Sequence, residues 1–402
     1  MYNKQIDKLT NYPFKRLDDL LSGINPPKNI TPNIMSIGEP QHLAPSIIKD
    51  EINNCALLWN KYPPVKGTKE FRLSIKNWLL KRFNLPHTFI NTETNILPLA
   101  GSREGLYMTG QLTIPKEKKG KKPIVLLPNP FYQVYLGSAL LSGAETLMLE
   151  LNKGNNFQHP IHNLDNDILD RTSTLFICNP SNPQGSIASK KYLTELILLA
   201  RKYSFILISD ECYSEIYYND PPTGLLEAAF DIGEGLKNIL IFNSLSKRSN
   251  VPGLRSGFVV GDEDLIDKFL KLRSHASAVQ PLPIMAVAKK LWEDEVHVIE
   301  SRNMYREKIY NASKIIGDSI DFNIPSGGFF LWLNVKNGTK FTKNLWAKAA
   351  IKVLPGKFLS TPNKYGITPG DEYIRVALVH DKEKTDNAIK KIVDIYMSSD
   401  TN

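Results

Sequence analysis

One lysine, Lys247, stands where a folded chain can present a reactive amine. It follows a short, apolar and β-branched run, residues 238–243, that indicates a buried strand. The hydroxyl residues Ser244 and Ser246 flank it, and Arg255 comes shortly afterwards. A lysine just beyond a strand end, among groups able to hold an anion, is what Schiff-base chemistry with a phosphorylated aldehyde requires. Taken alone, the same lysine fits an ordinary solvated side chain equally well.

Polar residues also follow two other predicted strands. Asn182 lies in a loop with two Asn-Pro pairs and a glycine, residues 179–185, directly after the apolar run 174–178. Such a loop is rigid, although it fits a plain turn as well. Asp210 ends the next apolar run, and Tyr213 comes soon after it. An aspartate there is either a helix N-cap or the partner of a protonated ring nitrogen, which makes a pyridinium ring an electron sink.

A Gly-Ser turn, Gly101 and Ser102, opens a predicted helix and supplies a second group of anion donors. Backbone N–H groups and the helix dipole attract phosphate at such a turn, although most turns of this kind are only helix starts. Arg255 can grip a phosphate with two parallel hydrogen bonds. Tyr132 follows a Pro-Asn-Pro-Phe segment and is either a core aromatic or a ring that stacks on a cofactor.

Far along the chain, Arg375 lies inside an apolar, strand-like run, residues 373–378. A buried arginine must be paired, so its partner is either a structural carboxylate or the carboxylate of a substrate. Gly38, in a Ser-Ile-Gly-Glu-Pro segment, has no side chain and would let the backbone approach the same carboxylate.

Short apolar runs alternate with helical stretches between about residues 65 and 290. The expected strands are residues 124–127, 174–178, 205–209, 239–242 and 257–261. An amphipathic helix is expected over residues 189–203, with Leu193, Leu196, Ile197 and Ala200 on one face. This alternation predicts an α/β fold with a parallel sheet, and the continuous apolar runs indicate that helices cover both faces. Ligands bind at the carboxyl ends of such strands, where most of the residues above lie.

After Trp292 the pattern changes to a long charged helix, about residues 294–317, and then to a smaller α+β region. The chain length suggests about two domains at ~150 residues each. We therefore expect an N-terminal arm that is part of the small domain at residues 1–50, a large domain at residues 51–290, and a small C-terminal domain at residues 291–402.

Composition excludes several classes of protein. Of the 402 residues, 42% are hydrophobic and 23% are charged, as in soluble globular proteins. No apolar stretch reaches the length of a membrane span, and the N-terminus lacks the apolar core of a signal peptide. The three cysteines have no CxxC spacing, which argues against a disulfide framework or a metal site. We therefore expect a cytoplasmic protein that does not bind a membrane.

The formal net charge of +9 suits anionic ligands such as phosphates and carboxylates. Part of that charge is local, in the basic segment 116–122. A solvated turn between a helix and a strand is favoured over a nucleic-acid patch, because no aromatic residues interleave the lysines and no nucleic-acid-binding motif is present.

Taken together, these motifs resemble the class I and II aminotransferases over about residues 30–395. The matching positions, in the order of the family, are Gly38, Tyr62, Gly101, Ser102, Tyr132, Asn182, Asp210, Tyr213, Lys247, Arg255 and Arg375. The resemblance implies pyridoxal 5'-phosphate (PLP) as cofactor and fold type I. That fold has a large domain whose mostly parallel sheet is covered by helices, plus a smaller α+β domain. The implied substrates are small molecules, namely an amino acid and a keto acid.

The resemblance also implies a role for each residue. Lys247 forms the Schiff base with PLP and then moves the Cα proton of the substrate. Asp210 pairs with the ring nitrogen, and Asn182 and Tyr213 bind the ring oxygen. The cofactor-binding set is completed by Tyr132, Gly101, Ser102, Arg103, Ser244, Ser246 and Arg255. Arg375, with Gly38 and Asn182, receives the substrate carboxylate. Tyr62 reaches the phosphate of a neighbouring subunit, which implies a homodimer.

Within the family, the segments 101–104, 129–133 and 246–258 look most like N-succinyldiaminopimelate aminotransferases of lysine biosynthesis. That resemblance implies a long substrate with a distal carboxylate, and glutamate with 2-oxoglutarate as the second pair. Arg103 and Arg248 are extra cations near the site, and at least one is expected to bind the distal carboxylate. The alternative is a salt bridge to a nearby acid such as Glu104 or Glu211.

Two other functions stay open at this stage. Aspartate and aromatic aminotransferases and PLP-dependent β-lyases share every cofactor residue, so only substrate profiling separates them. A non-enzymatic PLP-sensing regulator would need an added DNA-binding domain, for which the short N-terminal arm leaves no room.

Overall fold

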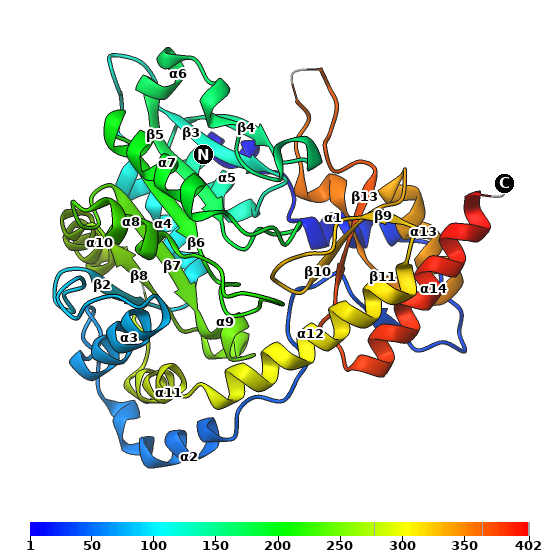
Figure 1. The fold of residues 1–402 in the computed structure, drawn as a ribbon, viewed down its shortest axis with the longest axis horizontal. Helices are drawn as coiled ribbons and strands as arrows, with labels where there is room; N and C mark the ends of the chain where they lie inside the picture. Colours follow the sequence, from blue (N-terminus) through cyan, green and yellow to red (C-terminus); the bar gives the residue numbers. More distant parts are fainter. Residues whose placement is uncertain (277, 364, 401–402) are drawn as a thin grey trace.

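The computed structural model describes residues 1–276, 278–363 and 365–400 (Figure 1). Its largest sheet has seven strands in the order β2-β8-β7-β6-β5-β3-β4. These strands are β2 (Ile96–Leu99), β3 (Ile124–Asn129), β4 (Glu145–Glu150), β5 (Thr172–Cys178), β6 (Ile206–Asp210), β7 (Ile239–Ser244) and β8 (Gly257–Gly261). The five predicted strands are therefore confirmed. β2 and β4 were not predicted: both are edge strands, β2 is short and contains Pro98, and β4 is only partly buried.

Within this sheet β8 runs antiparallel to both its neighbours, while the β4-β3-β5-β6-β7 pairs are parallel. The sheet is thus mostly parallel, as expected. The reversal of β8 has a consequence for the site. The beginning of β8, rather than its carboxyl end, lies at the edge where β6 and β7 finish, so Arg255 reaches that edge from just before the strand.

Helices cover both faces of the large sheet, which confirms the interpretation of its continuous apolar runs. One face packs against α3 (Lys69–Arg82), α7 (Lys190–Lys202), α8 (Leu225–Ile232) and α11 (Leu282–Glu293). The other face packs against α4 (Ser102–Thr113), α5 (Gln133–Leu141) and α10 (Glu263–Ala276). In β7, Ile239 and Ile241 point to the first face, whereas Leu240 and Phe242 point to the second.

From the large part of the molecule, α12 (Val296–Ile316), which matches the predicted charged helix, leads into a second, smaller part (Figure 1). Its antiparallel sheet has the order β12-β13-β10-β9 and comprises β9 (Asp321–Phe322), β10 (Phe330–Asn334), β12 (Leu354–Pro355) and β13 (Tyr373–Ala377). Alongside it lie α13 (Gly338–Ala349), α14 (Lys382–Asp400) and a two-stranded sheet in which β1 (Asn33–Ile34) pairs with β11 (Ile351–Lys352).

Because β1 pairs with β11, the N-terminal segment is built into the C-terminal part of the fold. The expected domain boundaries at residues 50 and 290 stay predictions. The remaining α-helices are α1 (Pro13–Leu21), α2 (Ile47–Asn54), α6 (Asn166–Arg171) and α9 (Leu245–Arg248). The 3₁₀ turns are η1 (Lys4–Lys8), η2 (Ala56–Asn60), η3 (Lys153–Asn155), η4 (Ile161–Asn163), η5 (Pro252–Leu254) and η6 (Gly356–Leu359).

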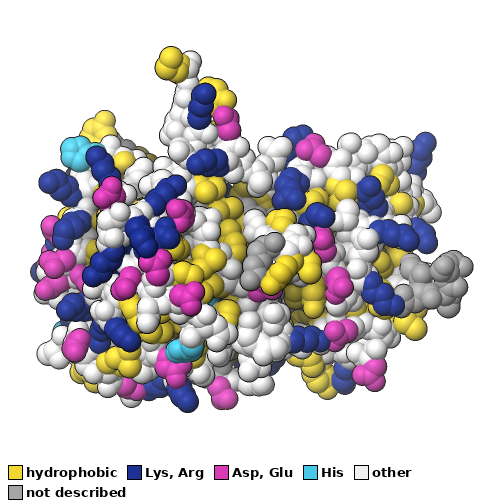
Figure 2. Space-filling view, turned by 90° about the horizontal axis from the view of Figure 1, so that it is seen from above, with side chains coloured by type: hydrophobic (Ala, Val, Ile, Leu, Met, Phe, Trp, Pro, Cys, Tyr) yellow, Lys and Arg dark blue, Asp and Glu magenta, His cyan; other side chains and the backbone are white. Residues whose placement is uncertain are grey.

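The surface carries charges of both signs. On the face shown in Figure 2, Lys and Arg side chains are interspersed with Asp and Glu, and apolar side chains gather along the middle of the molecule. In the basic segment 116–122, Lys118 donates to the main-chain carbonyls of Tyr203 and Ser204, at 2.8 and 2.9 Å. These contacts support the turn interpretation of that segment. Among the described helices, none combines the length and the apolar character that a membrane span needs.

The amphipathic helix α7 offers a direct test of the core. Its predicted inner face is fully buried, and Leu196 contributes to it with no exposed surface. Leu196→Ala is expected to lower the free energy of unfolding by about 2–5 kcal/mol, because shortening the side chain leaves a cavity. Leu198→Ala is the matched control, since Leu198 lies on the same helix but is 49% exposed. Urea denaturation measures both variants, and equal losses would contradict this packing.

Candidate active site

A cavity of about 530 Å³ opens where β5, β6 and β7 end and where the smaller part of the molecule meets the large sheet. It gathers most of the residues that the sequence singled out. The predicted residues that line it are Gly38, Ser102, Arg103, Tyr132, Asn182, Asp210, Tyr213, Ser244, Ser246, Lys247, Arg255 and Arg375. Three predicted residues, Gly101, Tyr62 and Arg248, do not line the cavity.

Lys247 extends into this cavity from α9, the short helix that follows β7. Its ammonium group donates a hydrogen bond to the carbonyl of Gly38 and lies 5.4 Å from the ring centroid of Phe329. Removal from water lowers the pKa of Lys247 to about 8, and the guanidinium groups of Arg375 and Arg255 act in the same direction. The side chain is therefore far more often neutral near neutral pH than an exposed lysine is.

Asp210 is the last residue of β6 and is 5% exposed. One carboxylate oxygen accepts a hydrogen bond from the hydroxyl of Tyr135 at 2.6 Å, and the other accepts from the backbone N–H of Cys212 at 3.3 Å. Burial raises the pKa of Asp210, and these hydrogen bonds oppose that rise. Tyr135 was not among the predicted site residues. No motif marks it, and only the stacking of its ring on Phe176 reveals why it points at Asp210.

Arg375 lies in the middle of β13 and is 5% exposed. Its guanidinium donates to the side-chain oxygen of Asn182 at 3.1 Å and to the carbonyl of Ser36 at 2.8 Å. It also lies 4.2 Å above the ring of Phe330. Removal from water lowers the pKa of Arg375 to about 10. Among the ion pairs of the described residues Arg375 has no carboxylate partner, and its Nε has no hydrogen-bond partner. A structural carboxylate is thus not what holds it.

The amino-terminal end of α4 lies beside Arg255 and forms a cradle of donors. Gly101 caps this helix with a φ of 83°, and a Cβ atom there would collide with the guanidinium of Arg255. A glycine at this position therefore leaves room for the guanidinium of Arg255. Arg255 is anchored by a hydrogen bond to the carbonyl of Pro252 at 2.8 Å. Beside it, the hydroxyl of Ser244 donates to that of Ser246 at 2.9 Å.

Arg103, the second residue of α4, lines another wall of the cavity. Its Nε donates to the hydroxyl of Tyr132 at 2.7 Å, and one terminal nitrogen donates to the hydroxyl of Tyr12 at 3.0 Å. Tyr12, which the sequence analysis missed, precedes α1 and lies in a segment whose composition carries no signal for a site. Among the ion pairs of the described residues, Arg103 has no carboxylate partner. Glu104, the acid considered for it, instead pairs with Arg273 at 3.0 Å.

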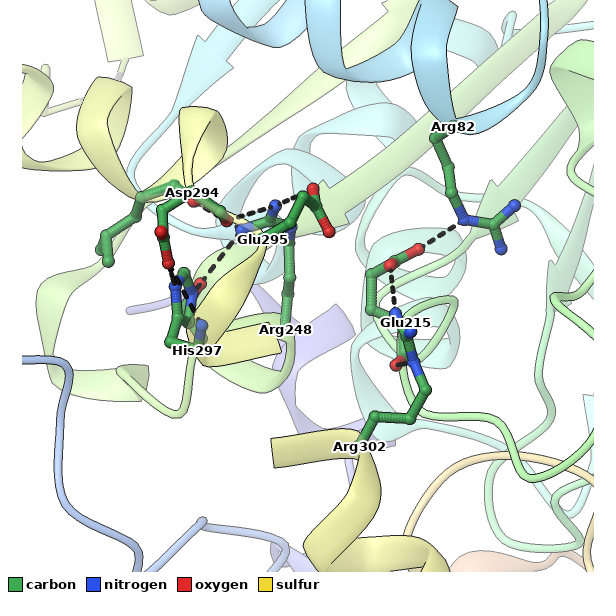
Figure 3. Close-up of polar contacts among 9 residues, drawn as sticks. Arg82, Glu215, Arg248, Asp294, Glu295, His297 and Arg302 are labelled. Atoms are coloured by element: carbon green, nitrogen blue, oxygen red, sulfur yellow. Dashed lines mark hydrogen bonds and ion pairs between the residues drawn. The ribbon is translucent and has the colours of Figure 1, made fainter. Parts of the chain in front are cut away.

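The prediction that Arg248 contacts a substrate carboxylate is wrong. Its side chain has no exposed surface and points away from the cavity, and it pairs with Glu295 at 2.6 Å (Figure 3). The sequence pointed to Glu211 as the alternative partner, but Glu211 accepts hydrogen bonds from Leu225 and Ser209. The chain turns at α9, so that Lys247 and Arg248 point in different directions despite being neighbours.

Tyr62 is fully exposed and lies outside the cavity, at the end of the segment that follows α2 and η2. Within the single chain it has no part in the site. Its expected contact with the phosphate of a neighbouring subunit stays a prediction.

Comparison with known proteins places this site in a family. A family model, "Aminotransferase class I and II", matches residues 33–392. The LL-diaminopimelate aminotransferase of Dehalococcoides mccartyi is 31% identical over 376 residues, which cover 90% of this chain and 91% of that protein.

Two solved structures extend the likeness to the fold. A crystal structure of an aminotransferase from Neisseria meningitidis has a TM-score of 0.92 and 39% identity, and it covers 98% of this chain and 100% of that chain. That of the aminotransferase AspB from Helicobacter pylori has a TM-score of 0.88 and 33% identity, with 96% and 98% covered.

These matches confirm the resemblance inferred from the motifs. Proteins of this family use pyridoxal 5'-phosphate as cofactor and act on small-molecule substrates, namely amino acids and keto acids. The mostly parallel covered sheet, the smaller α+β part and the cavity between them are the corresponding features of this structure. The chain belongs to the class I and II aminotransferases, and it is an enzyme of the PLP-dependent fold type I.

Proposed function

We propose that this aminotransferase moves an amino group between N-succinyl-L,L-diaminopimelate and 2-oxoglutarate. The position of Arg103 is the main support for this proposal. Arg103 places a second guanidinium in the cavity that contains Arg375, and two tyrosine hydroxyls hold it rather than a carboxylate. Two such cations suit a long substrate with a carboxylate at each end. The likeness to LL-diaminopimelate aminotransferases supports a substrate of this carbon skeleton.

The residues around the cavity fit PLP. Its phosphate suits the cradle formed by Arg255, Ser102 and the amino-terminal end of α4. Its ring nitrogen suits the buried carboxylate of Asp210, which Tyr135 orients. Its aldehyde suits the amine of Lys247. When bound, PLP supplies an electron sink for the bond pair released at the Cα atom of the substrate.

The chain's own residues then hold the ligands and move one proton. Arg375 binds the α-carboxylate, because it is buried and because no acidic side chain in the described ranges pairs with it. The side-chain oxygen of Asn182 accepts the hydrogen bond from Arg375. Its NH₂ group can therefore bind the ring oxygen together with Tyr213. When the amino donor reacts, the neutral Nζ of Lys247 takes the proton from its Cα atom. When the keto acid acceptor is aminated, Nζ gives a proton to the Cα atom of the acceptor. The lowered pKa of Lys247 favours its neutral form.

L,L-diaminopimelate itself is the second candidate, because relatives at about 30% identity carry the name LL-diaminopimelate aminotransferase. The two substrates differ at the end remote from the reaction. The free compound has an ammonium group beside a carboxylate there, so that end carries no net charge. Succinylation replaces the ammonium with an amide and adds a second carboxylate, so that end becomes negative. A cation at this end of the cavity therefore attracts the succinylated form more strongly than the free one.

Substitution of Arg103 separates the two candidates. Arg103→Gln is expected to lower kcat/KM for N-succinyl-L,L-diaminopimelate about 10- to 100-fold, the usual worth of a hydrogen bond to a charged group. The loss on L,L-diaminopimelate should be much smaller. Both compounds are assayed with 2-oxoglutarate as acceptor. Arg306→Gln, at an exposed position outside the cavity, is the control. Equal losses on both compounds, or a wild-type preference for the free compound, would overturn the proposal.

The lowered pKa of Lys247 predicts a pH dependence that needs no substrate. Only the neutral amine attacks an aldehyde, so the apoenzyme should capture PLP faster as the pH rises through about 8. An exposed lysine would give the same rise near its ordinary pKa of 10.5. Stopped-flow absorbance between pH 6.5 and 10.5 measures this rate. A midpoint close to 10.5 would show that burial does not activate Lys247.

We further propose that the enzyme is a homodimer and that Tyr62 reaches the neighbouring site. The apolar side chains of Leu57 and Trp59, shortly before Tyr62 in the sequence, are exposed and support the idea. Lys247→Ala and Tyr62→Phe chains should each be impaired alone. Co-expressed, they should regain activity, because a mixed dimer has one site with both wild-type residues. Mixed dimers purified with two affinity tags provide the measurement, and a lack of recovery would contradict the shared site.

A further inference from the structure

Arg248 follows Lys247 directly, yet it has no place in the cavity. Its guanidinium donates to the carbonyl of Leu291 at 2.6 Å and to that of Asp294 at 3.2 Å. It also pairs with Glu295 at 2.6 Å and lies 4.8 Å from the ring of Trp292. Thus every described polar contact of its terminal nitrogens but one, to Ser249, reaches the end of α11 or the start of α12 (Figure 3).

The two residues after Arg248 contact the same region. The hydroxyl of Ser249 lies 2.8 Å from Nε2 of His297, whose Nδ1 is hydrogen-bonded to the carboxylate of Asp294. The side-chain amide of Asn250 donates to the hydroxyl of Ser301 at 2.8 Å. Three consecutive residues after the lysine are therefore tied to the junction between α11 and α12.

The start of α12 is itself held to the large sheet by a second cluster. Arg302 donates to the carboxylate of Glu215 and to its main-chain carbonyl, both at 2.9 Å (Figure 3). Arg82, from α3, reaches the other oxygen of that carboxylate at 2.7 Å. Glu215 belongs to the loop that begins at Asp210, so the same part of α12 contacts both the lysine segment and the aspartate loop.

α9 has only four residues, Leu245–Arg248, and a helix this short does not hold its own shape. Its orientation must come from tertiary contacts. A buried guanidinium with several fixed acceptors is a strong source of such contacts, because any movement would leave a charge unpaired away from water. Catalysis depends on this orientation, since a displacement of the order of 1 Å can cost about 100-fold in rate.

We propose that Arg248 is a positioning residue that locks α9 against the start of α12 and so sets the direction in which Lys247 enters the cavity. The Ser249–His297 contact is a second part of the same lock. The inference goes beyond the proposed substrate and depends only on membership of the aminotransferase family.

The test uses substitutions outside the cavity. Glu295→Gln keeps an acceptor for Arg248 and removes the charge, and Glu295→Ala removes both. Ser249→Ala removes one hydroxyl and is the mildest change, so it serves if the others fail to fold. Glu293→Ala is the matched control, because Glu293 is exposed and its ion pair among the described residues is with the half-buried Lys289 on the same helix, at 3.6 Å.

Three measurements are made on each variant without substrate: the rate at which the apoenzyme captures PLP, the pH midpoint of the visible absorption of PLP bound to Lys247, and the melting temperature. We expect the capture rate to fall in the order wild type, Glu295→Gln, Glu295→Ala, with a loss on the order of tenfold in the last. Ser249→Ala should fall in the same direction by less, and the midpoint should move in each of these variants.

If the contacts of Arg248 and Ser249 only stabilised the fold, the substitutions would lower the melting temperature and leave the capture rate and the midpoint unchanged. Capture rates and midpoints equal to those of Glu293→Ala, in both Glu295→Ala and Ser249→Ala, would therefore overturn the proposal whatever happens to stability. The substrate question does not enter these measurements, so failure of the proposed substrate and failure of this inference are distinguishable.

Discussion

The removal of charged groups from water at one edge of the large sheet governs the rest of this structure. Asp210 and Arg375 are almost fully buried there, and Lys247 faces them across the same cavity. Taking such charges from water is costly unless hydrogen bonds compensate. The compensation is partial: Asp210 has two donors and Arg375 has two acceptors, but neither has an ion-pair partner within the described part of the chain. A bound ligand of opposite charge restores the electrostatic stabilisation that these groups lose when they leave water. The cost of burying the charges thus favours binding of a charged ligand.

Partial compensation is tolerable only if the polar groups cannot rearrange, which explains how the cavity is supported. The ring of Phe330 lies under Arg375, and the stacked pair of Tyr135 and Phe176 holds the hydroxyl that reaches Asp210. Close packing of this kind leaves the charged side chains few alternative positions. The same logic extends to Arg248, whose acceptors come from the end of α11 and from the two residues that join it to α12. In the proposal made above, the orientation of Lys247 thus depends on a neighbour that does not line the cavity.

The joint at the start of α12 also relates the two parts of the molecule. Arg302 and Glu215 connect α12 to the large sheet, while the other end of this helix packs on α14. The Gly38 carbonyl that accepts from Lys247 lies in the arm that returns to the smaller part through β1. Lys247 is therefore held on one side by the large sheet and approached on the other by the arm, so its environment reflects the relative placement of both parts.

The sequence by itself determined the family, the cofactor and most of the cavity, because strand-end motifs such as those of Asn182, Asp210 and Lys247 are local and parallel strands bring their carboxyl ends to one edge. It also predicted the buried face of α7 and the long helix α12, whose periodic patterns are local. Only the tertiary structure decided the direction of Arg248, the approach of Tyr12 and Tyr135, and the edge strands β2 and β4. Each depends on partners distant in sequence: Arg248 turns away because α11 and α12 offer acceptors, and Arg255 reaches the site because β8 is reversed. Residue type and spacing record which groups can react, but the packing of distant segments sets where they point.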